Sequence, residues 1–386
     1  MKIINIIGAR PQFIKYFPIS RAIISSSEEQ PESLQDILIH TGQHYDYLMS
    51  KVFFDEFGIP APHYHLEVGS GPHGRQTGEI LAKVEEVLER EKPQLILVYG
   101  DTNSTLGGAL AAAKLHLPVA HVEAGLRSYN KYMPEEINRI LTDQLSTLLF
   151  CPSEAAIYNL QKEGFANIFN AGSLVPVEPP QEMFTDLGMI NKNQPLIINN
   201  GDIMYDVLLF AVQAAAHRST VLSRLHLTAG GYAILTLHRA ENTDNIRRFD
   251  EIIDFVNGVA QDYRVVFPVH PRTQKVYGQA KNRFSSRVEM IEPLGYFDMV
   301  NLLQQAALVM TDSGGLQKEA YWLKVPCITL RDETEWVETV ASGWNVLYKD
   351  YQGRHYPNIA AEPAYGDGRA AMRIVRVISH LGRNLS

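Results

Sequence analysis

Short apolar runs alternate with helix-like segments along most of the chain, and this alternation constrains the fold more than any other feature. Runs that are apolar at every position are typical of strands buried on both faces, as in a parallel sheet covered by helices. Their alternation with helices predicts βαβ units. We therefore predict an α/β protein with two doubly wound, Rossmann-like domains and a ligand in the cleft between the carboxyl ends of both sheets. The runs lie at 3–7, 37–39, 95–99, 119–122 and 148–151, and at 233–237, 265–269, 288–291, 308–310 and 327–330.

A compositional break separates the two halves. Residues 171–200 hold four prolines together with Gly, Asn and Gln and show no clear periodicity, which predicts a linker or a surface insertion. The flanking domains are then residues 1–170 and 201–366, followed by a helical segment at 367–386. A chain of 386 residues is long enough for two or three domains with sizeable cores.

The amino-acid composition indicates which binding partners and which cellular location to expect for the protein. The 35 Lys and Arg against 43 Asp and Glu give a formal charge of −8, so no broad basic face is expected for nucleic acid or an acidic membrane. No run approaches the ~20 apolar residues that a membrane helix needs, and the first apolar run meets Arg10 too soon for a signal peptide. Cys151 and Cys327 adjoin apolar runs, which favours buried, reduced thiols. We expect a cytoplasmic protein without nucleic-acid or membrane partners.

Several common ligand-binding motifs are absent from the sequence. The first strand is followed by Gly8-Ala9-Arg10-Pro11 instead of G-x-G-x-x-G, so a dinucleotide redox domain is not expected. The chain has no G-x-x-x-x-G-K-[ST], no C-x-x-C and no H-E-x-x-H. His63 and His65 would face one way on a strand, but no acidic or thiol partners lie nearby in the sequence. We therefore predict no metal site.

The stretch 307–319 has the character of an anion-binding turn. An apolar strand ends at Thr311-Asp312-Ser313-Gly314-Gly315, and a helix follows. Two glycines let the backbone approach a bulky group, and the N–H groups of the first helical turn favour an anion. Glu319 lies in that helix, where its carboxylate can accept from sugar or ribose hydroxyls. The alternative is a structural turn with Asp312 or Ser313 as N-cap.

Two cations mark the first strand-to-helix turn. Arg10 and Lys15 flank Pro11 at the start of a predicted helix, where the helix dipole disfavours positive charge. The placement makes sense if a carboxylate or a phosphate lies beside them. Solvated surface charges are the alternative interpretation.

Carboxylates end two successive strands of the first half. Asp101 and Glu123 follow the runs at 95–99 and 119–122, and these strands are neighbours in the usual doubly wound order. Mutual repulsion could raise the pKa of one of them and so provide both an acid and a base. Alternatively, Asp101 caps the next helix and Glu123 pairs with Arg127.

Three further side chains are candidates for proton transfer or phosphate binding. Glu135 follows Pro134 at a predicted helix start, although acids are common there for structural reasons alone. His238 follows the first strand of the second half and precedes Arg239, which suits a phosphate or proton-transfer role. His270 follows another strand in the same way.

Seven ordered motifs together resemble the non-hydrolysing UDP-N-acetylglucosamine 2-epimerases, over nearly the whole chain apart from 171–200. The resemblance implies a GT-B fold whose C-terminal helix, 367–386, crosses back to the first domain. It also implies a homodimer that inverts C2 of a UDP-amino sugar without a cofactor, for cell-surface polysaccharide synthesis. The motifs are Gly8-Ala9-Arg10-Pro11 with Lys15, His40-Thr41-Gly42-Gln43-His44, Gly100-Asp101-Thr102, His121-Val122-Glu123-Ala124-Gly125-Leu126-Arg127, Pro134-Glu135-Glu136-Ile137-Asn138-Arg139, His238-Arg239-x-Glu241-Asn242 and Thr311-Asp312-Ser313-Gly314-Gly315-x-Gln317-x-Glu319.

The resemblance also implies roles for individual residues. The family eliminates UDP to a 2-acetamidoglucal and adds it back with the opposite configuration at C2. The acid–base candidates are Asp101, Glu123 and Glu135, and His238 is a further catalytic group near the phosphates. Gln43, His44 and Arg75 match positions that bind a second, activating UDP-sugar in some bacterial members. The substrate-binding residues are Arg10, Lys15, Arg139, His270, Ser313, Gly314, Gly315 and Glu319.

Two departures from the family pattern leave the sugar open. Met133 stands where members acting on UDP-N-acetylglucosamine usually have Trp, and Trp336-Val337 stands where they tend to have Arg-Pro. The second pattern, with Met204-Tyr205-Asp206, is similar to the branch that epimerises UDP-2,3-diacetamido-2,3-dideoxyglucuronate. A GT-B glycosyltransferase and a non-catalytic UDP-sugar sensor are the alternatives from other functional classes.

Overall fold

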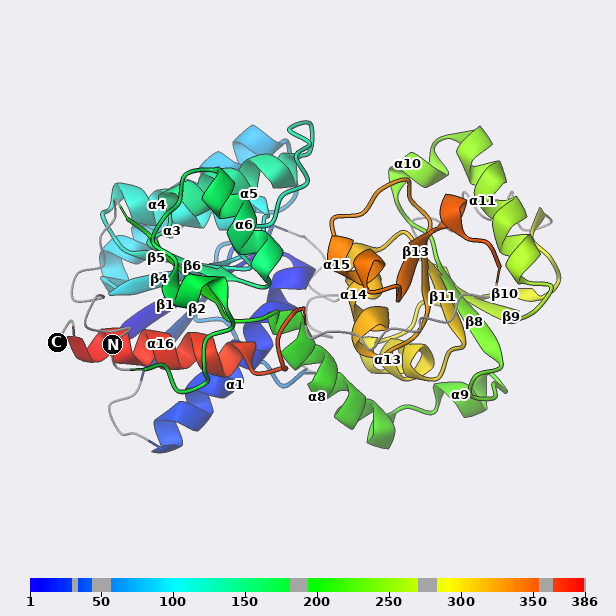
Figure 1. Ribbon diagram of the computed structural model, residues 1–386. Coiled ribbons are helices and arrows are strands. Elements are labelled where there is room, and N and C mark those ends of the chain that lie inside the picture. Colours follow the sequence, from blue (N-terminus) through cyan, green and yellow to red (C-terminus); the bar gives the residue numbers. More distant parts are fainter. Residues whose placement is uncertain (30–33, 44–56, 181–193, 270–282, 354–363, 385–386) are drawn as a thin grey trace. The chain divides into compact units, whose positions relative to one another are not determined.

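A computed structural model describes residues 1–29, 34–43, 57–180, 194–269, 283–353 and 364–384 (Figure 1). The chain forms two compact units, Met1–Val207 with Ala364–Ser386, and Leu208–Pro363. Each unit is built around its own parallel sheet, with helices packed against it. The prediction of an α/β fold with two Rossmann-like units is therefore confirmed.

The first unit has a seven-stranded parallel sheet in the order β3-β2-β1-β4-β5-β6-β7. Apart from the edge strand β3, its strands are largely buried and dominated by Ile, Leu and Val, the composition expected for strands covered on both faces. The strands are β1 (Lys2–Ile7), β2 (Gln35–His40), β3 (Tyr64–His65), β4 (Leu95–Tyr99), β5 (Val119–Val122), β6 (Leu148–Cys151) and β7 (Leu196–Asn199). The helices are α1 (Arg10–Glu29), α3 (His73–Glu91), α4 (Asn103–Lys114), α5 (Pro134–Leu145), α6 (Glu154–Lys162), η1 (Phe169–Gly172) and α16 (Ala370–Asn384).

The second unit has a six-stranded parallel sheet in the order β10-β9-β8-β11-β12-β13. Alternate residues of β8 enter two different apolar clusters, because successive side chains of a strand point to opposite faces. The strands are β8 (Tyr232–Thr236), β9 (Arg264–Pro268), β10 (Val288–Ile291), β11 (Leu308–Thr311), β12 (Cys327–Thr329) and β13 (Asn345–Leu347). The helices are α8 (Ile203–Arg218, which begins in the first unit), α9 (Val221–Arg224), α10 (Ala240–Thr243), α11 (Ile246–Val259), α13 (Tyr296–Gln304), α14 (Gly314–Trp322), α15 (Val337–Ala341) and η3 (Tyr348–Asp350).

Both sheets contain the doubly wound strand order 3-2-1-4-5-6, counted within each unit. In this order, strands 2 and 3 are added on one side of strand 1 and strands 4 to 6 on its other side. The loops that follow strands 1 and 4 therefore lead away from each other, and the place between them is called the switch point. The switch points lie between β1 and β4 in the first unit and between β8 and β11 in the second. Ligands of such sheets bind outside the carboxyl ends of these strands.

The segment 171–200 differs from its predicted role as a linker or insertion. It contains part of η1 and the whole of β7, which pairs with β6 at the end of the first sheet. The strand has only four residues directly after Pro195, so its short apolar run is hidden by the Pro- and Asn-rich composition around it. The two units divide at Val207–Leu208, and not at the predicted boundary of residue 201.

Helix α16 belongs to the first unit and packs beside α1 (Figure 1). One face of α16 is fully buried and apolar, formed by Ile374, Val375, Val377, Ile378 and Leu381. This apolar stripe fixes the end of the chain on the sheet that the chain began.

Both cysteines are buried free thiols, as the apolar runs beside them predict. Burial raises the pKa of Cys151 and of Cys327, because the thiolate would lose its hydration. Within the described ranges, no helix is long and apolar enough to cross a membrane.

The carboxyl of Asp206 provides a pH-dependent link between α8 and α16. It accepts hydrogen bonds from the backbone N–H groups of Ala370 and Ala371, at 3.0 and 2.9 Å. Burial raises the pKa of Asp206 to about 7, although the two N–H donors oppose the shift. The folded state therefore holds a proton that the unfolded chain releases at lower pH, and stability falls as pH rises toward 7.

We predict that Asp206→Asn removes this dependence. In urea titrations, the free energy of unfolding of the variant minus that of wild type should increase by on the order of 2 kcal/mol as the pH rises from 5 to 7. Asp367→Asn is the matched control, because hydrogen bonds from Arg373 hold the pKa of Asp367 below its usual range. The difference in unfolding free energy between Asp367→Asn and wild type should stay constant from pH 5 to 7. The same constant difference for Asp206→Asn would contradict the prediction.

Candidate active site

The loop after β1 lies in close contact with neighbouring elements at the first switch point. The side chain of Gln12 accepts from the N–H groups of Gly8 and Ala9 at 2.8 and 3.0 Å. A Cβ atom at Gly8 would lie 2.0 Å from Thr41 Oγ1 and 2.1 Å from Ser104 Oγ. Only glycine therefore lets β1, β2 and the start of α4 converge at this point.

Glu123 occupies a strained backbone position at the end of β5. Its φ is 71°, in the left-handed region that residues other than glycine rarely adopt. Its carboxylate pairs with Lys15 of α1, and both side chains are largely buried. The alternative that Glu123 pairs with Arg127 is wrong, because Arg127 pairs with Asp143 and Glu163. Strain of this kind often accompanies a functional side chain, since the surrounding structure must hold it in place.

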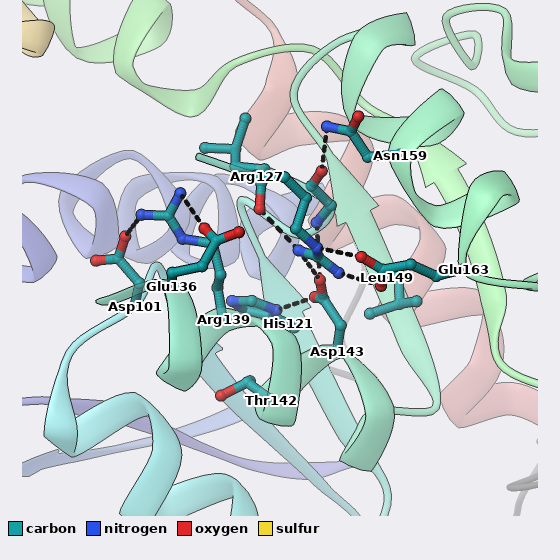
Figure 2. Close-up of polar contacts among 12 residues, drawn as sticks. Asp101, His121, Arg127, Glu136, Arg139, Thr142, Asp143, Leu149, Asn159 and Glu163 are labelled. Carbon is teal, nitrogen blue, oxygen red and sulfur yellow. Dashed lines mark hydrogen bonds and ion pairs between the residues drawn. The ribbon is translucent and has the colours of Figure 1, made fainter. Parts of the chain in front are cut away.

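Asp101 faces α5 instead of capping α4. The N-cap of α4 is Thr102, whose hydroxyl accepts from the N–H of Thr105, so the capping alternative for Asp101 is wrong. The Asp101 carboxylate pairs with Arg139 at 2.5 Å, and its side chain is one-third exposed (Figure 2). Asn138 donates to the Asp101 carbonyl at 2.9 Å. Asp101 and Glu123 thus leave adjacent strands, and each has its own cation.

The two acids at the start of α5 have different surroundings. Glu136 is buried and accepts from the N–H and the hydroxyl of Ser128, at 2.8 and 2.9 Å, and from the N–H of Tyr129 at 2.9 Å. It therefore holds the loop that leads into the helix. Glu135, the predicted acid–base candidate, is exposed.

At the second switch point, Asp312 orients His238. Asp312 Oδ1 lies 3.0 Å from His238 Nδ1. Its Oδ2 accepts from the N–H groups of His238 and Arg239, at 2.9 and 2.8 Å, and from the amide of Asn242 at 3.1 Å. Burial alone would raise the pKa of Asp312, but the hydrogen bonds and the nearby imidazole hold it below its usual range. Asp312 is fully buried and the His238 side chain is half exposed, so a buried carboxylate fixes an accessible imidazole.

The start of α14 carries the predicted anion-binding turn. Ser313 is at the N-cap position but makes no capping hydrogen bond to the described first turn, so the structural alternative of a side-chain cap is not realised. A Cβ atom at Gly314 would lie 2.7 Å from Glu335 Oε1 and 2.8 Å from Trp336 Nε1, so only glycine fits there. Gly315 is exposed. Glu319 is buried two turns further on, where it accepts from the hydroxyl of Tyr296 at 2.8 Å.

Two of the predicted activator residues, Gln43 and Arg75, lie at or beside α3. Gln43 accepts from the N–H and the hydroxyl of Ser104, at 3.0 and 2.6 Å, so its side chain is bound within the first unit. Arg75 is exposed in the first turn of α3. His44, His270 and the side chain of Arg10 lie outside the described residues.

Sequence reasoning missed the residues that hold the candidates in place. Gln12, Asp143 and the carboxylate of Asp312 all act on backbone or side-chain groups far away in the chain. The one available signal is that each lies in or beside a quoted motif. Over the described part of the chain, no group of three or more His, Cys, Asp or Glu side chains is arranged to hold a metal ion.

Two parallel sheets of this strand order, each with helices packed against it, fit the GT-B class of α/β proteins. A family model described as UDP-N-acetylglucosamine 2-epimerase matches residues 27–379. The chain belongs to this family and is therefore an enzyme of the isomerase class.

Individual relatives span essentially the full length of the chain. A UDP-N-acetylglucosamine 2-epimerase homolog of Methanococcus maripaludis is 46% identical over 99% of this chain and 100% of its own. The UDP-2,3-diacetamido-2,3-dideoxy-D-glucuronate 2-epimerase of Pseudomonas aeruginosa is 44% identical over the same shares. The crystal structure of Methanocaldococcus jannaschii UDP-GlcNAc 2-epimerase, in complex with UDP-GlcNAc and UDP, aligns with a TM-score of 0.79 at 39% identity. That alignment covers 98% of this chain and 99% of the other.

We predict that Asp312→Asn destabilises the protein strongly. The amide replaces a buried acceptor that faces three N–H donors and the His238 ring, so the free energy of unfolding should fall by about 2–4 kcal/mol. The control is Asp332→Asn, because the half-exposed Asp332 pairs with Arg248 and Lys349 at the surface of the same unit. That change should cost less than about 1 kcal/mol. Equal losses for the two variants in urea titrations would contradict the role given to Asp312.

Proposed function

We propose that the protein is a UDP-N-acetylglucosamine 2-epimerase that interconverts UDP-GlcNAc and UDP-ManNAc. The observation that carries the proposal is the pair of carboxylates on adjacent strand ends, Asp101 and Glu123, in a chain of this family. Each is held by a cation and so is prepared to act at a fixed position. The crystal structure of the Methanocaldococcus jannaschii relative with UDP-GlcNAc and UDP supports the choice of ligand.

The proposed chemistry is an anti elimination followed by re-addition. No carbonyl is bonded directly to C2 of the sugar, so simple removal and return of its proton would be very slow. Departure of UDP lets the electrons of the C2–H bond form the double bond of 2-acetamidoglucal. UDP then returns to C1 while a proton is added to the opposite face of C2, which gives the epimer. The route needs a base near C2, an acid for the return step and a site that stabilises the leaving diphosphate.

The first unit supplies the proton-transfer groups in this proposal. Asp101, Glu123 and Glu135 are the acid–base candidates, and the residues leave open which of them removes the C2 proton. Lys15 and Arg139 hold two of these carboxylates and, with Arg10, provide positive charge for an anionic substrate.

The second unit supplies the nucleotide-binding groups. His238, fixed by Asp312, is assigned to the diphosphate together with His270 and the start of α14. Gly314 and Gly315 contribute backbone N–H groups and Ser313 a hydroxyl there, where the helix dipole favours an anion. Glu319 is assigned to the ribose, and Tyr296 would then share its carboxylate.

A second candidate sugar is UDP-2,3-diacetamido-2,3-dideoxyglucuronate, processed by the same mechanism. The 44% identity to the Pseudomonas aeruginosa enzyme of that name favours it. So does Trp336, which stands where members acting on UDP-GlcNAc tend to have Arg. Trp336 lies against Gly314 at the start of α14, so this departure adjoins the proposed diphosphate site.

The resemblance alone supports three further proposals. The enzyme acts as a cytoplasmic homodimer, its product serves cell-surface polysaccharide synthesis, and a second UDP-sugar at Gln43, His44 and Arg75 activates it. Gln43 adjoins Ser104 in the first turn of α4, so an activator would act next to the loop that carries Asp101.

We predict that the purified protein incorporates solvent deuterium at C2 of its substrate. Incubation in D₂O with UDP-GlcNAc, UDP-ManNAc and the diacetamido uronate, followed by NMR, should show C2 labelling and formation of the epimer. A glycosyltransferase would release UDP only with an acceptor, and a sensor would bind the nucleotide without labelling it. Absence of labelling with every UDP-sugar of the panel would overturn the proposal.

Amide variants test the two carboxylates. Asp101→Asn and Glu123→Gln should each lower the rate of C2 exchange by at least ~100-fold, because the amide cannot transfer the proton. UDP binding, measured by calorimetry, should be largely kept. The control is Glu89→Gln, an exposed carboxyl on α3, which should leave both measurements unchanged. Unchanged exchange in both amide variants would remove Asp101 and Glu123 from the mechanism.

A further inference from the structure

The imidazole of His121 on β5 has an acceptor at each of its two nitrogens, and Figure 2 shows one of them, Asp143. Its Nδ1 lies 2.6 Å from Asp143 Oδ1, and its Nε2 lies 2.7 Å from the carbonyl oxygen of Gly100. The side chain is completely buried. A carbonyl has no hydrogen to donate, and an ionised carboxylate has none either. Both short contacts are therefore satisfied only if the ring carries a hydrogen on each nitrogen.

The surroundings of Asp143 favour its ionised form. Burial alone would raise the pKa of this carboxyl, but the charges and hydrogen bonds of His121 and Arg127 lower it below its usual range. Its Oδ2 accepts from the N–H of Gly125 at 3.1 Å and lies 2.8 Å from an Arg127 nitrogen. The two donors at Oδ2, one of them charged, therefore favour the ionised carboxylate, and its Oδ1 then accepts from His121 Nδ1.

The buried charges around the ring balance one another. Arg127 binds Glu163 through two nitrogens, at 2.6 and 2.7 Å. With His121 and Arg127 positive and with Asp143 and the partly exposed Glu163 negative, the group has no net charge, which lowers the cost of burying the ring and its neighbours. Burial raises the pKa of the nearby Cys151 thiol, and Asp143 adds to the shift, so the thiol stays neutral.

This charge group connects the two carboxylate-bearing loops. Gly100, whose carbonyl faces His121, directly precedes Asp101. Gly125, whose N–H binds Asp143, lies two residues after the strained Glu123. Asp143 itself lies on α5, one turn after Arg139, which pairs with Asp101. Helix α5 and the His121 ring therefore bind both carboxylate-bearing loops.

We propose that His121 is a positioning residue that holds two protons and, between Asp143 and the Gly100 carbonyl, fixes the Asp101 and Glu123 loops relative to each other. The catalytic part of this inference rests on the proposed epimerase function. A neutral ring would leave one nitrogen lone pair against an oxygen, and the two loops would move apart. Displacements of about 1 Å at a reacting group can cost ~100-fold in rate.

Side-chain ¹⁵N NMR of the full-length protein tests the protonation directly. With labelled histidine, His121 should give two protonated ring nitrogens at pH 7.5. Its signal is assigned by its absence from His121→Gln, or by through-space contacts to Leu149, which is opposite His121 on β6. A neutral ring for His121 at pH 7.5 would overturn the inference whether or not the protein has epimerase activity.

The activity of Asp143→Asn tests the positioning role. The ring should then become neutral, and kcat for C2 exchange should fall by at least ~10-fold while KM changes less than about threefold. The matched control is Asp206→Asn, which changes another buried carboxyl of the same unit, one on α8 that binds the backbone N–H groups of α16. It should leave kcat unchanged.

The outcomes separate the two proposals. If wild type exchanges no UDP-sugar yet His121 is doubly protonated, the epimerase function fails while the ring's protonation stands. If wild type exchanges but Asp143→Asn keeps full kcat, the positioning role is wrong. Should Asp143→Asn not fold, His121→Gln replaces it in the same assay, since its amide can reach only one of the two acceptors.

Discussion

The parallel pairing of strands in the order 3-2-1-4-5-6 is the constraint on which the rest of the structure depends. It places the loops after β1, β4 and β5 at one edge of the first sheet, and those after β8 and β11 at one edge of the second. Residues about a hundred positions apart, such as Lys15 and Glu123, meet only because these strands pair. Four of the candidates, Asp101, Glu123, His238 and Ser313, each lie within two residues of a strand end that this pairing positions.

Buried charges then fix the loops that the sheets bring together. Asp312 binds two backbone N–H groups and the ring of His238. Asp143 binds the N–H of Gly125, in the loop after β5, and the ring of His121. In both units a carboxylate that touches no solvent orients an imidazole. Such groups are costly to bury unless every lone pair has a donor, and here the donors come from the loops themselves. The conformation of each loop and the hydrogen bonding of its buried carboxylate therefore depend on each other.

The sequence predicted the longer apolar strands and the side chains at their ends, because fully apolar runs and glycine-rich exits depend on local composition, but it did not predict the short strands β3, β7 and β13. It did not predict the partners of those side chains. Glu123 has a sequence neighbour of opposite charge, Arg127, but the structure pairs it with Lys15 because α1 packs across the end of β5. Asp101 could cap α4 from its position, but Thr102 does so, and Arg139 takes the carboxylate. The edge strand β7 was missed because four residues after a proline give too weak a pattern.

The account's central claim is that the bond between the sugar and UDP breaks and re-forms while the first-unit carboxylates move the C2 proton. Positional isotope exchange tests this claim most directly, with a UDP-sugar that carries ¹⁸O in the bridge between C1 and the β-phosphate. Reversible cleavage should carry the label from the bridge into non-bridging positions of the β-phosphate, detected by the ³¹P isotope shift. Epimer formation with the label retained entirely in the bridge would contradict the account.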